Sequence, residues 1–222
     1  MFNLFRRPSA QKRLALLGCL GFLLLGGCAS TRFSSVPPVP TTPLCQSAQQ
    51  PLAGLVFWET RWRPEQKDVA EREKAAAQGI QAFFKQGNCF QSVQIQQIQA
   101  TTPLATNQTV AAIQAWASQT TLPQRVLKIE VRELGPVLKL FASPALLDGG
   151  TEVVLDIREL NPESAEDLQR FQVHWQNGGP WVLKGVAGLA EDMETALKAA
   201  LMGERGPASG SAHAGKLPLI VG

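Results

Sequence analysis

The sequence is poor in the side chains that carry most enzyme chemistry. Tyrosine is absent from its 222 residues, and His174 and His213 are its two histidines. A histidine-based metal site needs further ligands at a recognisable spacing, and the sequence offers none. A serine–histidine–acid triad would depend on His174, because His213 falls in a tail rich in glycine, serine and alanine. We therefore expect no catalytic residue, no metal and no cofactor.

Several motifs that mark enzymes are also missing. The chain has no G-x-S-x-G nucleophile elbow, no C-x-x-C redox pair, and no phosphate loop or G-x-G-x-x-G after residue 27. The acid pairs Glu152/Asp156 and Glu163/Glu166 have the chemistry of general acids and bases. Their surroundings favour solvated strand faces and loop charge instead. These absences predict a protein that is not an enzyme.

One apolar run is present, near the amino terminus. Residues 1–13 hold four basic side chains and no acid, residues 14–25 are apolar or small, and Gly26-Gly27-Cys28 follows. A charged start, a short apolar core and small residues at the exit are typical of an export signal. A membrane span needs roughly 20 apolar residues, so this core is short for an uncleaved anchor helix, which remains the alternative.

The tetrapeptide Leu25-Gly26-Gly27-Cys28 resembles the lipobox of bacterial lipoprotein signal peptides. The resemblance implies that residues 1–27 are removed. Cys28 then becomes the first residue, with a diacylglyceryl group and, in many Gram-negative bacteria, an amide-linked acyl chain such as palmitate. Ala29 stands where retention in the inner membrane favours aspartate. The resemblance therefore implies anchorage at the periplasmic face of the outer membrane, with the inner membrane as the alternative.

The formal charge of +3 does not describe the exported protein. Removal of four basic residues from 21 leaves 17 Lys plus Arg against 18 Asp plus Glu, a net charge of −1. A nearly neutral chain lacks the basic stripe that nucleic-acid binding requires. It also gives no electrostatic reason to adhere to anionic lipid. We expect the membrane, through Cys28, and another envelope protein as partners.

Two cysteines remain for the folded protein. Cys19 lies in the apolar core of the signal segment and Cys28 carries the lipid, which leaves Cys45 and Cys89. Thiols in an oxidising compartment pair readily. We predict a Cys45–Cys89 disulfide, with two free thiols as the alternative.

Composition divides the exported chain into three parts. Residues 28–51 are rich in Pro, Ser and Thr and predict a polyproline spacer that holds the domain away from the bilayer, with a docking peptide as the alternative. Residues 52–202 form the periplasmic domain. Residues 203–222 form a flexible tail, whose apolar end at 217–221 either packs weakly or binds a partner.

Residue periodicity predicts the elements of the domain. Apolar–polar alternation or β-branched and aromatic content predicts strands over 54–62, 92–98, 125–132, 151–158 and 170–176, with a short apolar run at 137–141. Apolar residues at helical spacing predict helices over 64–86, 107–116 and 185–202. We expect Gly135-Pro136, Gly149-Gly150 and residues 177–180 to end strands.

This order predicts an α+β fold. We expect a single mixed, largely antiparallel sheet of about four to six strands, with about three helices packed mainly on one face. The combination of lipidated cysteine, proline-rich segment and small domain resembles the auxiliary lipoproteins of ABC-type transporters. It also resembles the lipoprotein activators of penicillin-binding proteins.

Aromatic residues supply the candidate partner surface. Trp58 and Trp62 share one strand face, and Trp181 follows a glycine pair, so all three are candidates for a partner site. A role in the core or in a turn is the alternative for each. The sequence thus predicts a non-catalytic, lipid-anchored binding or assembly module. A transporter accessory that handles an apolar substrate is the alternative, and an envelope hydrolase is third.

Overall fold

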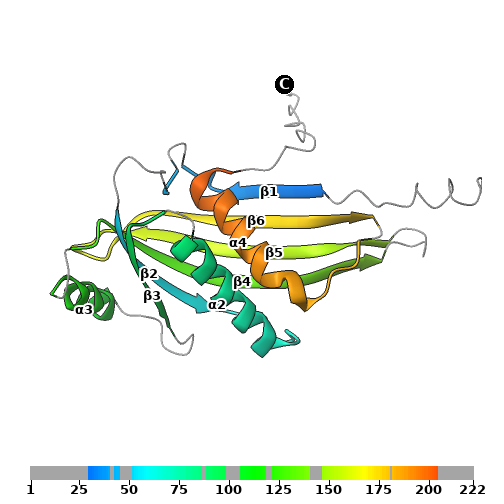
Figure 1. Ribbon diagram of the computed structural model, residues 1–222, viewed down its shortest axis with the longest axis horizontal. Helices are drawn as coiled ribbons and strands as arrows, with labels where there is room; N and C mark the ends of the chain where they lie inside the picture. Colours follow the sequence, from blue (N-terminus) through cyan, green and yellow to red (C-terminus); the bar gives the residue numbers. More distant parts are fainter. Residues whose placement is uncertain are drawn as a thin grey trace, which may run out of the picture.

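The computed structural model describes residues 30–40, 43–45, 52–86, 89–98, 106–118, 122–140, 147–180 and 182–204. A six-stranded mixed sheet with the order β1-β6-β5-β4-β2-β3 forms its centre (Figure 1). The strands are β1 (Ser30–Val36), β2 (Ala53–Thr60), β3 (Ser92–Gln97), β4 (Arg125–Leu140), β5 (Leu147–Leu160) and β6 (Asp167–Pro180). The helices are α2 (Val69–Gln86), α3 (Thr106–Ala117) and α4 (Leu189–Leu197), with a short 3₁₀ helix at Val186–Gly188 before α4 and a π-helical segment at Lys198–Met202 after it.

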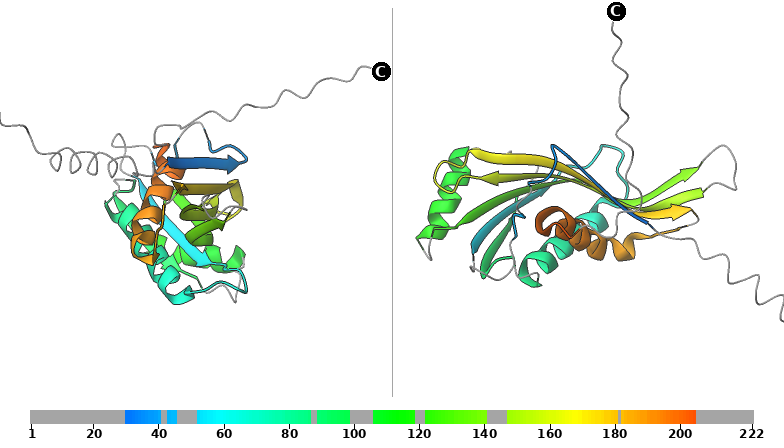
Figure 2. Two further views of the ribbon diagram at one scale, coloured as in Figure 1. Left: turned by 90° about the vertical axis from the view of Figure 1, so that its right-hand side faces the viewer. Right: turned by 90° about the horizontal axis from the view of Figure 1, so that it is seen from above.

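Helices α2 and α4 lie together on one side of the curved sheet (Figure 2). Their apolar faces and the inward residues of β2, β4, β5 and β6 form the main core, which contains Ile80, Phe83, Leu155 and Trp175. Helix α3 places Ile113 in a smaller cluster with strand residues of the opposite face. The predicted α+β fold, with its mixed sheet and helices mainly on one face, is confirmed.

Strands β4, β5 and β6 form the predicted antiparallel meander, but they are longer than predicted. The expected breaks at Gly135-Pro136, at Gly149-Gly150 and at residues 177–180 are wrong, because the strands run through them. Proline is tolerated at position 136 because β2 pairs with β4 only as far as Val131, which leaves β4 an edge beyond that point.

The amino-terminal boundary also differs from the prediction. The part of 28–51 that the structure describes is not a polyproline spacer, because Ser30–Val36 is strand β1 and pairs antiparallel with β6. Beyond it, Val39, Leu44 and Cys45 are buried in the core. The Ser and Thr residues of β1 lie at a sheet edge, where polar residues are tolerated. The folded domain therefore includes residues ahead of position 52.

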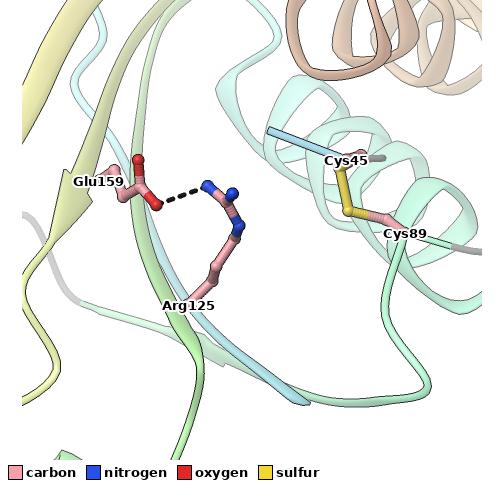
Figure 3. The surroundings of a disulfide bond; sticks show 4 residues. All are labelled: Cys45, Cys89, Arg125 and Glu159. Carbon is pink, nitrogen blue, oxygen red and sulfur yellow. Dashed lines mark hydrogen bonds and ion pairs between the residues drawn. A yellow bond between two sulfur atoms is a disulfide. The ribbon is translucent and has the colours of Figure 1, made fainter. Parts of the chain in front are cut away.

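The predicted disulfide is confirmed: Cys45 and Cys89 are bonded, with their Cα atoms 4.7 Å apart (Figure 3). Cys89 lies just before β3, and the backbone N–H of Cys45 donates a hydrogen bond of 2.9 Å to the carbonyl of Leu201. The disulfide therefore joins the segment after β1 to the region between α2 and β3, and the backbone hydrogen bond joins the same segment to the end of the last helix. Helix α2 begins at Val69 instead of Pro64, because Pro64 and Glu65 form a turn.

The close contact between α2 and α4 depends on Gly79. A Cβ at this position would lie 2.6 Å from the carbonyl oxygen of Ala190 and 2.6 Å from the Cβ of Met193. Gly79→Val must push the helices apart, and we expect it to lower the free energy of unfolding by about 1–3 kcal/mol in urea titrations. Gln78→Val is the matched control, since Gln78 is exposed on the same helix. Equal effects of the two substitutions would contradict the assigned contact.

Candidate functional site: the open face of the sheet

One face of β4, β5 and β6 is polar beyond the end where Ile113 of α3 packs against Val126 and Leu160. Alternation along the strands sends Val153, Leu155 and Ile157 into the main core and their neighbours in the opposite direction. We call this second surface the open face. Its side chains are Glu130, Arg132, Glu152, Val154, Asp156, Gln172, His174 and Gln176.

Charges of both signs alternate across the open face. Arg132 lies 2.8 Å from Glu130 and 3.5 Å from Asp156, and the Gln172 amide donates a 3.0 Å hydrogen bond to Asp156. Arg61, just beyond β2, lies 3.5 Å from Glu130. The Arg61 and Arg132 side chains are about half exposed, at 48% and 44%, whereas the carboxylates between them are nearly buried. Guanidinium groups therefore form the outer layer, held in place by carboxylates beneath them.

His174 contacts the carboxylate of Glu152 on the neighbouring strand. The Gln176 amide donates a 3.3 Å hydrogen bond to the same carboxylate. Ser34 of β1 stands opposite His174 in the strand register, but no hydrogen bond between these two appears among the described contacts. A flat sheet surface supplies no converging backbone N–H groups for an oxyanion. The predicted outward position of His174 is confirmed, and its partners form a cross-strand ladder.

A second cluster lies at the edge of β4, where β2 has ended. A bulge between Val131 and Glu133 shifts the strand register by one residue there. The buried Glu133 carboxylate contacts Arg63, accepts a 3.2 Å hydrogen bond from Gln66, and lies 3.0 Å from Arg72. The hydrogen bond to Glu133 raises the pKa of the exposed Arg63 guanidinium. The cluster therefore fixes the segment after β2 against the sheet edge.

Arg72 reaches this cluster from the start of α2. Its Nη1 donates to the Leu134 carbonyl at 2.7 Å, and its Nε donates to the Lys67 carbonyl at 2.8 Å. Gly135 leaves the space for this guanidinium, because a Cβ there would lie 1.5 Å from Nη1. The arrangement accounts for a glycine in the middle of a long strand.

A hollow of about 430 Å³ lies between the two groups of charges. Trp62 forms part of its wall and is half-buried, with an indole Nε1 that has no hydrogen-bond partner among the described residues. A buried indole N–H without a partner is costly. The hollow is lined by Arg61, Trp62, Arg63, Pro64, Arg132, Glu133, Glu152, Val154 and Gln172.

The sequence-predicted site residues have different outcomes. Trp58 is 3% exposed and belongs to the main core, so its assignment to a partner surface is wrong. The reason is that β2 is an interior strand, buried from Gly54 to Thr60 on both faces. Trp62 lies at the hollow, where its assignment stays a prediction. Cys28 and Trp181 lie outside the described residues.

The described part of the chain holds no group of three or more His, Cys, Asp or Glu side chains suited to a metal ion. Within the same ranges, no helix has both the length and the hydropathy needed to cross a bilayer.

No family model matches the sequence, and no curated protein matches it. Similar solved structures include the PelC dodecamer of Paraburkholderia phytofirmans, with 14% identity, 78% of this chain and 99% of that chain covered, and a TM-score of 0.38. The lipoprotein GNA1162 of Neisseria meningitidis has 16% identity over 69% of this chain and 100% of that chain, with a TM-score of 0.35. Protein XCC0632 of Xanthomonas campestris has 14% identity over 72% and 85%, with a TM-score of 0.32. These likenesses concern the backbone arrangement alone.

Proposed function

We propose that this protein is a lipid-anchored envelope protein that binds another envelope protein through the open face of its sheet. The observation that carries the proposal is Leu25-Gly26-Gly27-Cys28 after a charged and apolar leader. Two acyl chains or more anchor a protein stably, so Cys28 would be a lasting attachment. The disulfide agrees with an oxidising compartment. The residue after Cys28 favours the periplasmic face of the outer membrane.

The open face suits a protein partner with polar groups. Arg132 and Arg61 present half-exposed guanidinium groups that can each bind a carboxylate through two N–H groups. Glu152 and Gln172 lie beside them and accept or donate hydrogen bonds. Mixed charges of this kind increase the specificity for one partner surface more than they increase the affinity. They do not form the basic stripe that nucleic acid requires.

The competing functions receive less support. A hydrolase would need a nucleophile activated by a base, and the described contact of the His174 ring is with the Glu152 carboxylate, which is not a nucleophile of that kind. A transporter accessory for apolar substrates would need an apolar groove, whereas the hollow beside Trp62 is lined mostly by charged and amide side chains. We therefore propose a binding module that is not an enzyme.

The anchor is tested by Cys28→Ser. We expect this variant to lose its acyl chains, because serine has no thiol to carry the diacylglyceryl group. Cys19→Ser is the matched control, since Cys19 lies in the segment that the signal peptidase discards, and it should keep its acyl chains. Mass spectrometry of the amino-terminal peptide reports the modification. An unmodified peptide that begins at Met1 would contradict the proposal.

The binding face is tested by photo-cross-linking in intact cells. A photoreactive residue at Gln172 or at Arg170, both exposed on the outward side of β6, should form an adduct with the same envelope protein. Gln81 is the control, because it is exposed on α2, on the other side of the sheet. Identification of one shared partner from the two strand positions, and not from Gln81, supports the proposal. The same adduct from all three positions would count against the open face.

A further inference from the structure

We propose that the end of the sheet at which β1 begins lies against the bilayer, where its exposed apolar side chains contact lipid. The contact surface consists of Leu138, Leu183 and Val186, which we call the lipid-facing end. This inference rests on the proposed lipid anchor at Cys28. It adds an orientation: the domain does not hang free in the periplasm but stands with one defined end on the membrane.

Chain length provides the first argument. Strand β1 begins at Ser30, two residues after Cys28. An extended chain spans at most about 3.6 Å per residue, so two residues reach about 7 Å. The spacer predicted from the proline-rich composition would have separated the domain from the membrane by tens of ångströms. Because the strand starts where the spacer was expected, the first residue of the sheet must lie within about 7 Å of the acylated cysteine.

The strand register identifies what accompanies Ser30. Ser30 pairs with Gly178 of β6, Gly178 pairs with Gly150 of β5, and Gly150 pairs with Val137 of β4. These four residues form one row across the sheet. Figure 1 shows the start of β1 at the same end of the sheet as the ends of β4 and β6, whereas α3 lies at the opposite end. If Ser30 is held at the bilayer, this end of β1, β6, β5 and β4 is held at the bilayer as well.

Apolar side chains are exposed just beyond this row. Leu138 is 54% exposed, Leu183 is 75% exposed and Val186 is 41% exposed. Leu138 lies near the segment that carries Leu183, because a Cβ on Gly149 would lie 2.2 Å from the Val182 carbonyl oxygen and 3.4 Å from a methyl carbon of Leu138. Val186 follows three residues after Leu183. Single exposed apolar residues need no explanation. A group of them beside a lipid anchor can be buried in the bilayer to which the anchor holds the protein.

Charges at this end are compatible with contact. The Lys184 ammonium lies 3.0 Å from the Asp192 carboxylate, so the cation between Leu183 and Val186 is already paired. Arg32 and Asp148 line a small pocket on the open face and contribute one charge of each sign. Glu191 lies beside Lys184 and Asp192 as well, so the end carries charges of both signs and its lipid contact would depend on apolar burial.

The test uses the full, lipidated protein in vesicles of phosphatidylethanolamine and phosphatidylglycerol. An environment-sensitive NBD fluorophore is attached through Leu183→Cys, and in a second protein through Leu138→Cys. The introduced thiol is free to react because Cys45 and Cys89 are bonded to each other. Leu168→Cys is the matched control, since Leu168 is 58% exposed at the start of β6, at the far end of the sheet.

We expect a blue shift of the NBD emission at positions 183 and 138, with about half of it quenched by shallow doxyl lipids, because interfacial side chains sit roughly 5–10 Å into the headgroup boundary. Position 168 should remain water-like and unquenched. Water-like emission at 183 and 138 in protein that floats with the vesicles would overturn the inference while leaving the anchor intact. Protein that does not float would refute the anchor itself.

Two other occupants are distinguished in the same experiment. A blue shift that doxyl lipids do not quench, and that falls as the protein is diluted in the bilayer, would indicate burial against a second copy and would overturn the lipid contact. A shift that needs a cell extract would indicate another protein and would overturn it as well.

Discussion

Replacing both Cys45 and Cys89 by alanine should lower the free energy of unfolding by about 4 kcal/mol. The two cysteines are 44 positions apart, and the chain-entropy model gives about this value for a loop of that length. The side chains are buried at 3% exposure each, in contact with the main core, so their loss also removes packing. For a domain of this size, each kcal/mol shifts the melting temperature by about 2–4 °C. We therefore expect a fall of about 8–16 °C.

The measurement is thermal unfolding with and without reductant. The unsubstituted protein should lose the same stability when it is reduced, whereas the double variant should be insensitive to reductant. A single Cys45→Ala variant should match the double variant, since either substitution removes the disulfide. A double variant that melts within about 2 °C of the oxidised protein would contradict this prediction. It would show that the unfolded chain keeps enough structure for the disulfide to remove little entropy from it.

Lys128→Met should have an effect of similar size. Glu59 on β2 is 0% exposed, and the Lys128 ammonium lies 3.0 Å from one of its carboxylate oxygens. Lys128 is its one ionic partner among the residues that the structure describes. Removal of one member of a buried pair leaves an uncompensated charge, which typically costs about 3–5 kcal/mol. We expect that loss in urea unfolding at neutral pH.

Two further variants make this prediction specific. Glu59→Leu combined with Lys128→Met should recover most of the lost stability, because replacement of a buried pair by apolar residues is often neutral. Lys198→Met is the matched control, since Lys198 pairs with Glu194 at 2.7 Å on the exposed side of the last helix. An exposed pair of this kind contributes about 0.3–0.5 kcal/mol. A double variant no better than Lys128→Met alone would refute the argument.

The elements of the fold were predictable where local patterns are strong. Strands with strict alternation, such as the one through Leu127 and Ile129, and the helices with apolar residues at helical spacing appear close to their predicted positions. Strand ends were not predictable, because Gly149-Gly150 and Gly178 act through their partners on other strands instead of as turns. How closely two strand backbones approach depends on the residues of both strands. It therefore cannot be predicted from the sequence of one strand alone.

The candidate site was less predictable than the fold. The alternation of Lys128, Glu130 and Arg132 indicates a polar face, but the bulge that follows re-aims Glu133 towards Arg72. Sequence alone also placed Trp58 on a surface, because nothing local indicates that β2 is an interior strand with helices on both sides. The disulfide was predictable, since the expected roles of Cys19 in a signal segment and of Cys28 in lipidation leave Cys45 and Cys89 to pair.

The pairing of β1 with β6 has a consequence for the order of assembly. Ser30 and Gly178, which are joined by a hydrogen bond, are 148 positions apart, so β1 cannot pair until almost the whole chain is available. Closing so long a loop is slow relative to forming the local β4–β5–β6 meander. We expect the meander to form first and β1 to join it last. Until then the outer edge of β6 stays unpaired, and β1 of a second molecule could occupy it.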